Sequence, residues 1–337
     1  MNLSEIEKKL GEKAKLAVSL YLLDEKGLIT LEEGYKTEVM MPMASTKKVA
    51  IALSILKKIY DDQELSLATN ITIKNTDFSP GRPTNTLDRY YFRPWSIETT
   101  RTVDELLTYM LTESDNTSTD VLLGLAGGPD KVNELISQLN IEGHHLSFTS
   151  KKLLADYFKV PEEKSINSIL QILYEFISAY SVRPTENCLA ESEEDACTAK
   201  MMTDLLKLLV SQDEKPSWIG KAANVLLEKM RQCKTGETLI KKGAIEFFPR
   251  PTDFGSKQGG LGGIRNDTAF IQFKEGHWAI LSIHTCQSNL SLKERDEIIS
   301  DLAKEILITH CNLQPQLKEP SEEEYQDSWL PTCCTLF

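Results

Sequence analysis

The chain has 337 residues, 41% of them apolar, and its 38 Lys+Arg against 50 Asp+Glu give a formal net charge of −12. The apolar fraction is enough for a packed core, so a wholly disordered chain is excluded. The acidic balance argues against nucleic-acid partners, whose phosphates need a basic surface. No run approaches the roughly 18 uncharged apolar residues of a membrane span.

Predicted strands lie near both ends of the chain, and predicted helices lie between them. Alternating residues over 15–33, with a turn at 25–27, predict a hairpin, and two further strands are expected over 268–273 and 277–285. Helical periodicity predicts the connecting elements at 45–60, 102–111, 120–127, 130–139, 166–180, 200–210 and 224–232, and a closing helix at 292–310.

This order of elements indicates an α/β (α+β) fold, in which an antiparallel sheet is assembled from both chain ends around a helical insertion. We place the discontinuous sheet domain at 1–40 and 221–311, and the helical domain at 41–220. The last segment, 312–337, is Pro-rich and acidic, so we expect a solvated tail there.

Cysteine and histidine usage favours a reducing compartment and no metal centre. The seven cysteines are odd in number and form no C-x-x-C pair, and neither H-E-x-x-H nor G-x-S-x-G occurs. We therefore expect neither a metal ion nor another cofactor. The first residues, MNLSEIEKKL, lack the apolar segment of a Sec signal, which predicts a cytoplasmic location in the producing cell.

The first motif with chemical meaning is S-x-x-K, formed by Ser45 and Lys48 at the start of a predicted helix. Free N–H groups of a first helical turn favour developing negative charge, and a desolvated lysine one turn later can accept a hydroxyl proton. The motif recurs at Ser54 and Lys57 inside the same helix, where a solvated lysine is the simpler interpretation. Alone, S-x-x-K is weak support for catalysis.

The second motif is S-D-N at residues 114–116, between two predicted helices. Taken alone it is typical of a helix N-cap. Together with S-x-x-K about seventy residues earlier, it matches the motif set of penicillin-recognising serine enzymes. With the flanking runs MPMASTKKVA, MLTESDNTSTDVLLGLAGGPDKVNELISQL and GSKQGGLGGIRNDTAFIQF, residues 5 to 310 resemble the class A β-lactamase family.

The resemblance implies an α/β domain, an all-helical domain and a site between them. It implies Ser45 as nucleophile and Lys48 as its base. It also implies that Ser114 relays a proton to the leaving group and that Asn116 orients Lys48 and substrate.

The family's K-T/S-G strand motif aligns with residues 257–259, whereas the literal K-T-G at 234–236 is expected at a surface turn. Backbone N–H groups of Ser45 and Gly260 are then expected to form the oxyanion hole. The substrate-binding residues implied by the resemblance are Asn116, Lys257, Gln258, Gly259, Gly260 and Arg265.

Two departures from the family pattern bear on turnover of β-lactams. Gln258 replaces the family's Thr or Ser, whose hydroxyl helps bind the substrate carboxylate, and Arg265 is a candidate to compensate. The family's E-x-x-L-N loop is matched only by Glu186 to Ala190, so Glu186 is a candidate general base without its usual Asn partner. Without a placed base, water attack on an acyl-enzyme slows by about 10²–10⁴-fold.

Three functions remain open from these residues. The first is a serine hydrolase that forms an acyl-enzyme with a small-molecule or peptide amide or ester. The second is a penicillin-binding-type transacylase or carboxypeptidase. The third is a catalytically inactive binding module on the same fold.

The final residues fit a C-a-a-X prenylation signal in which Cys334 carries the lipid and the terminal Phe337 favours geranylgeranyl. Cys333 beside it is a candidate for a second lipid, and two incidental cysteines are the alternative. Bacteria do not normally prenylate proteins. The expectation is therefore an effector delivered into a eukaryotic cell, modified by a host prenyltransferase and peripherally attached to a membrane.

Overall fold

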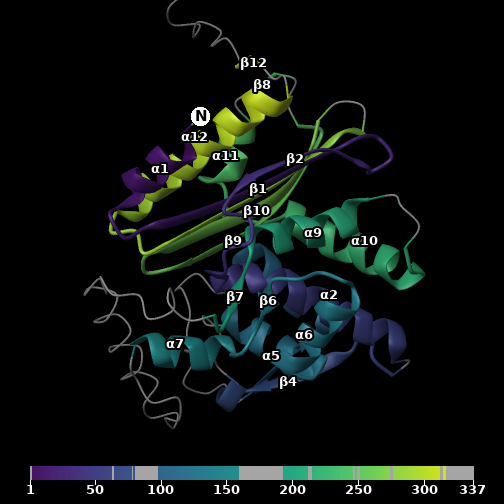
Figure 1. The fold of residues 1–337 in the computed structure, drawn as a ribbon. Coiled ribbons are helices and arrows are strands. Elements are labelled where there is room, and N and C mark those ends of the chain that lie inside the picture. The colour runs from purple at the N-terminus through teal and green to yellow at the C-terminus, as the bar shows by residue number, and fades with distance from the viewer. Residues whose placement is uncertain are drawn as a thin grey trace, which may run out of the picture.

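The computed structural model describes residues 2–62, 64–77, 79, 98–158, 193–211, 215–245, 247–248, 251–273, 276–311 and 314–315. At its centre is an antiparallel five-stranded sheet with the order β2-β1-β11-β10-β9 (Figure 1). The strands are β1 (Lys15–Leu23), β2 (Ile29–Tyr35), β9 (Asp253–Leu261), β10 (Ile264–Gln272) and β11 (Trp278–Cys286). Because β1 pairs with β11, the two ends of the chain meet in the middle of the sheet.

Short glycine turns set the register of two neighbouring strand pairs. Gly27, with φ of 84°, closes the turn between β1 and β2. Gly262, with φ of 54°, begins the two-residue turn between β9 and β10. Both conformations are strained for residues that carry a Cβ, so glycine fits these turns.

Helices cover both faces of the sheet (Figure 1). On one face lie α1 (Leu3–Leu10), α11 (Ile240–Ile245) and α12 (Leu292–Cys311), which bury apolar side chains with Leu20, Ala269 and Leu281 of the strands. On the other face, α9 (Ala199–Val210) and α10 (Ser217–Arg231) pack with Tyr21, Phe270 and Ile280. Successive residues of a strand point to opposite faces, which explains why neighbours such as Leu20 and Tyr21 enter different cores.

The helical part contains α2 (Lys48–Asp61), α4 (Val103–Thr108), α5 (Asn116–Ala126), α6 (Pro129–Gln138) and α7 (Ser150–Phe158). Short helical turns lie at η1 (Ala44–Lys47), η2 (Asn75–Asp77) and η3 (Tyr109–Glu113). Small strands complete it: β3 (Met41–Pro42) with β7 (Ala196–Cys197) and β6 (His144–His145), and β4 (Asn70–Lys74) with β5 (Glu98–Thr102). The remaining pair is β8 (Phe247–Phe248) with β12 (Gln314–Pro315).

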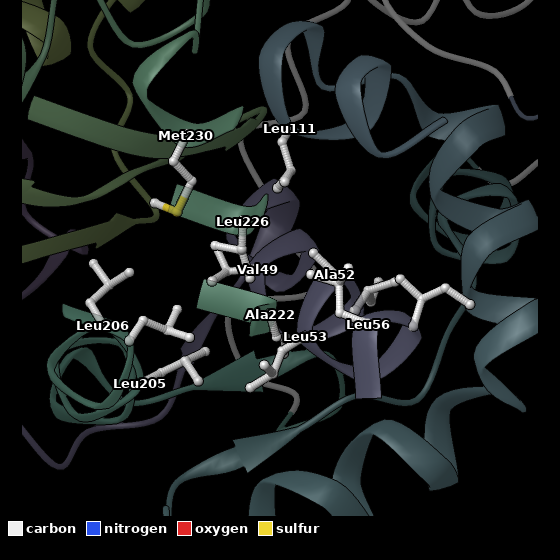
Figure 2. Packing of buried hydrophobic residues seen from close by; sticks show 14 of the residues in the cluster. Val49, Ala52, Leu53, Leu56, Leu111, Leu205, Leu206, Ala222, Leu226 and Met230 are labelled. Atoms are coloured by element: carbon white, nitrogen blue, oxygen red, sulfur yellow. The ribbon is translucent and has the colours of Figure 1, made fainter. Parts of the chain in front are cut away.

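Helix α2 lies at the centre of the larger core. Figure 2 shows Val49, Ala52 and Leu53 of α2 beside side chains of α9 and α10. Val49 and Leu53 are fully buried, and truncating a leucine in such a place costs about 2–5 kcal/mol. The residues that precede α2 are therefore attached to a rigid helix.

The predicted fold class is confirmed, and the structure refines several predicted elements. The helix expected from residue 45 begins with the 3₁₀ turn η1, and its α-helical part starts at Lys48. The helix expected over 102–111 ends in the π-helical turn η3. The predicted helix at 166–180 lies outside the described residues, and the domain division at 40 and 221 stays a prediction. In the part of the chain that the structure describes, no helix is long and apolar enough to span a bilayer.

Candidate active site

Ser45 lies in a tight turn, residues 43–48, which we call the Ser45 turn. Strand β9 approaches it closely, because a Cβ built on Gly259 would lie 2.7 Å from the Met43 carbonyl oxygen and 2.9 Å from the Ser45 nitrogen. Such distances are too short for any other residue. The Asn266 side chain adds a hydrogen bond of 2.7 Å to the Pro42 carbonyl oxygen. The turn is thus held directly against β9 and β10.

Lys48 is the first residue of α2 and is fully buried. Its Nζ lies 2.8 Å from Ser114 O and 2.8 Å from Asn116 Oδ1, both of which accept from it, and 3.0 Å from the Ser114 hydroxyl Oγ. Burial and then the nearby Lys257 ammonium lower the pKa of Lys48 well below its ordinary value, and Lys47 adds to the effect. Asp115 and Asp120 oppose this shift. Burial is the largest cause, so a neutral amine is favoured here.

The turn that carries Ser114 has an unusual backbone. It follows the π-helical η3, and Ser114 itself adopts a left-handed conformation with φ of 63°. Asp115 then caps α5, with its Oδ1 accepting the Ser118 N–H at 2.6 Å. This geometry directs both the carbonyl and the hydroxyl oxygen of Ser114 to Lys48 Nζ. Left-handed non-glycine residues and π turns are found often at functional sites.

Lys257 approaches Ser114 from strand β9. It is fully buried, and its Nζ donates to Ser114 Oγ at 3.2 Å and to Gln258 O at 2.8 Å. The hydroxyl of Ser114 therefore lies between two lysine nitrogens, one from α2 and one from the sheet. This arrangement brings four predicted site residues, Lys48, Ser114, Asn116 and Lys257, into one hydrogen-bonded group.

Gln258 and Arg265 form a second polar group at the edge of the site. Gln258 Oε1 accepts from Arg265 Nη1 at 2.7 Å, and both side chains are buried. The guanidinium also binds Asp296 of α12, with Nε at 2.6 Å and Nη2 at 2.9 Å from its carboxylate oxygens. Gly260 pairs with Arg265 in the β9–β10 register. The amide of Gln258 thus occupies one side of the Arg265 guanidinium.

Two acids near the site, the partly buried Asp120 and the buried Asp195, have roles that motif reasoning missed. Asp120 of α5 accepts the backbone N–H of Ser150 at 2.6 Å and of Lys151 at 2.8 Å, and so caps α7. Asp195 forms an ion pair of 2.6 Å with Lys47, and both side chains are almost completely buried. The Ser-Phe-Thr-Ser run at 147–150 is a helix-start signal that could have revealed α7, but no local pattern links Asp195 to Lys47.

Several predicted positions lie elsewhere. Glu186, Ala190, Cys333 and Cys334 lie outside the described residues. The literal K-T-G begins at Lys234, whose side chain is 69% exposed and pairs with Glu113 at 3.1 Å. Of these two aligned lysines, Lys257 and not Lys234 lies beside Ser114. Within the described ranges, no three His, Cys, Asp or Glu side chains gather as a metal site would require.

Comparison with known proteins gives a consistent result. The family model described as "Beta-lactamase enzyme family" matches residues 3–309. A β-lactamase of Bacteroides uniformis is 23% identical over 315 residues, covering 90% of each chain. The β-lactamase VEB-1 of Pseudomonas aeruginosa is 26% identical over 309 residues, covering 87% of this chain and 85% of the relative.

Solved structures show the same fold. A variant of the last common ancestor of Gram-negative bacteria class A β-lactamase superposes with a TM-score of 0.71 at 21% identity, covering 93% of this chain and 98% of the other. The chromosome-encoded β-lactamase of Vibrio parahaemolyticus gives a TM-score of 0.69 at 17% identity, with 91% and 97% coverage.

Proposed function

The chain belongs to the β-lactamase enzyme family, and on that premise we propose that it is a serine hydrolase that forms an acyl-enzyme on Ser45. The proposed substrates are small-molecule or peptide amides and esters. The observation that carries the proposal is Lys48: a buried amine hydrogen-bonded to Ser114 and Asn116, one helical turn after Ser45, with Lys257 on the far side of Ser114.

In the proposed acylation step, neutral Lys48 takes the proton of the Ser45 hydroxyl as its oxygen attacks the substrate carbonyl carbon. The backbone N–H groups of Ser45 and Gly260 stabilise the oxyanion that forms. When the bond from the carbonyl carbon to the leaving group breaks, the proton passes from Lys48 through Ser114 to the departing nitrogen or oxygen. The hydrogen bonds of Ser114 Oγ with Lys48 and Lys257 support this relay.

Asn116 and Lys257 act on the same relay without exchanging protons. The Asn116 amide oxygen, 2.8 Å from Lys48 Nζ, fixes the direction of the amine. Lys257 disfavours a second positive charge on Lys48 and orients the Ser114 hydroxyl. Lys257 thus favours the neutral form of Lys48, and Asn116 orients its amine in the resting enzyme.

The substrate contacts are proposed to depart from those of β-lactamases. Arg265 already donates to Gln258 and Asp296, so a substrate carboxylate competes with Gln258 for the guanidinium. Substrates with a neutral group at this position avoid that competition. Turnover of β-lactams is therefore expected to be slow relative to acylation by activated neutral esters.

The deciding experiment uses intact-protein mass spectrometry with an activated phosphonate, which leaves a stable bond to a reactive serine. We expect one adduct on the wild-type chain and none on Ser45→Ala. Ser54→Ala is the matched control, since Ser54 begins the second S-x-x-K of α2 and its Lys57 forms a surface pair with Asp61. Absence of a Ser45 adduct on the folded wild-type chain would favour the non-catalytic binding module.

A second experiment separates hydrolase from transacylase. With benzylpenicillin or an activated ester, rapid product formation in water indicates hydrolysis, whereas product that requires an added amine indicates acyl transfer. Glu186→Gln is expected to slow water attack by about 10²–10⁴-fold and to accumulate acyl-enzyme. Glu191→Gln, from the same acidic stretch, is the control; equal rates in both variants would remove Glu186 from the mechanism.

The C-terminal residues support a further proposal about location. Where Phe337 is the last residue, a prenyltransferase of a eukaryotic host would transfer the isoprenoid of a prenyl diphosphate to the Cys334 sulfur, with release of diphosphate and the thiol proton. Cys333 is available for a second lipid. One lipid gives weak, reversible membrane attachment, so peripheral association after delivery into such a cell is expected.

The test is expression in eukaryotic cells, followed by membrane fractionation and mass spectrometry of the C-terminal peptide. Cys334→Ser is expected to lose the lipid and shift the protein to the soluble fraction. A chain extended by several residues after Phe337 keeps every side chain but destroys the signal. An unchanged share of protein in the membrane fraction in both variants would refute the proposed prenyl anchor at Cys334.

A further inference from the structure

Asp195 holds both ends of the Ser45 turn. Its backbone carbonyl oxygen accepts the Met43 N–H at 2.9 Å, before Ser45, and its carboxylate Oδ2 lies 2.6 Å from Lys47 Nζ, after Ser45. A single residue on a distant part of the chain thus fixes the turn from both sides. The pair is isolated from water, with side-chain exposures of 3% for Lys47 and 2% for Asp195.

The same pair is anchored to a third segment, the turn before α7. Asp195 Oδ1 accepts the backbone N–H groups of Ser147 and Phe148, each at 2.8 Å. Lys47 Nζ donates to the Phe148 carbonyl oxygen at 3.1 Å. Asp195 also adopts a left-handed backbone with φ of 52°. A non-glycine residue keeps this costly conformation only where its surroundings fix it, and here several hydrogen bonds do so.

Lys47 also places a positive charge next to Lys48. The charged groups that face Lys48 are Lys257 from β9, Asp115 and Asp120 from α5 and its cap, and Lys47 from the Ser45 turn itself. Asp195 offsets the charge of Lys47 through the ion pair. The imidazole of His144, which faces this pair, has its pKa lowered by burial to about 4 and is neutral in the working range.

We propose that Lys47 and Asp195 are positioning residues for acylation: together they fix the Ser45 turn and set the local charge beside Lys48. This proposal rests on the proposed function, because Lys48 must act as the base. The two partners then have opposite effects on the proton affinity of Lys48. Loss of the Asp195 charge leaves an unbalanced cation, whereas loss of Lys47 leaves an unbalanced anion.

The test is the pH profile of Ser45 modification by an activated phosphonate, measured by rapid quench and mass spectrometry. The acidic limb is the part of the pH profile in which the rate rises with pH, because more Lys48 becomes neutral. Asp195→Asn is expected to move this limb to lower pH, and Lys47→Met is expected to move it to higher pH. At a fixed pH on that limb, each effect corresponds to a change of about 3- to 10-fold for one unit charge a few Å away. The modification rate at the plateau of the pH profile is expected to fall in both variants, because the Ser45 turn loses part of its support.

The double variant Lys47→Met/Asp195→Asn removes both charges and is expected to return the limb to the wild-type pH. The double variant also keeps the proposal testable if a single variant fails to fold, because it leaves no unpaired charge at the buried pair. A merely structural pair would lower the plateau without moving the limb in either direction, and that result would overturn the inference. Absence of any Ser45 adduct on the folded wild-type chain would instead overturn the proposed function.

Discussion

Replacing Lys257 with methionine tests how the sheet acts on the relay. The change removes an ammonium 3.2 Å from Ser114 Oγ while keeping an unbranched side chain of similar length. A hydrogen bond from a charged donor contributes about 1.5–3 kcal/mol. If that contact is made in the transition state, Lys257→Met slows acylation by about 10- to 150-fold.

The same substitution changes the pH dependence in a defined direction. Lys257 is the largest charge–charge cause that lowers the pKa of Lys48, so its removal raises that pKa. A higher pKa means that the neutral amine becomes available only at higher pH, and the acidic limb of acylation moves upward.

The assay is rapid-quench acylation over a pH series, with urea unfolding as a check on folding. Lys234→Met is the matched control: it removes the lysine of the literal K-T-G, which is exposed and paired with Glu113. Acylation by Lys257→Met within about 3-fold of wild type, with an unmoved limb, would refute the electrostatic role assigned to Lys257.

Three further predictions concern the support of the site. Gly259→Ala forces a methyl group against the Ser45 turn, so the acylation rate is expected to fall by at least about 10-fold. Circular dichroism is expected to show unchanged secondary structure. A normal acylation rate would contradict the close approach of β9 to the turn. Asp120→Ala removes the cap of α7 and is expected to lower the unfolding free energy in urea by about 1–3 kcal/mol, and a smaller loss would mean that water replaces the carboxylate. Burial lowers the pKa of His144 and His284 to about 4, below the ordinary value of about 6.5. The unfolded chain therefore binds more protons between these values, and stability is expected to fall as pH drops from about 6.5 to 4, by up to about 3 kcal/mol per histidine. An unfolding free energy that does not change between about pH 6.5 and about pH 4 would contradict this prediction.

Periodic and local features of the sequence predicted much of the fold. The hairpin at 15–33 and the helices that became α5, α6, α9 and α12 are amphipathic segments with clear turn residues, and their types were predicted. Strand β9 is different, because its sequence DFGSKQGGL has no apolar alternation. Its position followed only from the family resemblance, although it carries Lys257.

The site shows the same division between local and long-range signals. Ser45 and Lys48 are one turn apart, so their proximity follows from helical geometry. The Lys47–Asp195 pair joins residues 148 positions apart, and nothing in the neighbourhood of either residue indicates the other. The left-handed Ser114 was equally hidden, because its conformation depends on the π turn before it and the Asp115 cap after it.

The central claim is that Lys48 is a neutral amine at working pH. Selective ¹³C labelling of lysine side chains, with assignment by Lys48→Arg, allows its titration to be followed by NMR in the folded chain. We expect Lys48 to lose its proton at a pH well below the pKa of about 10.4 of an unperturbed lysine. A Lys48 that keeps its proton up to that pH would contradict the assignment of Lys48 as the base.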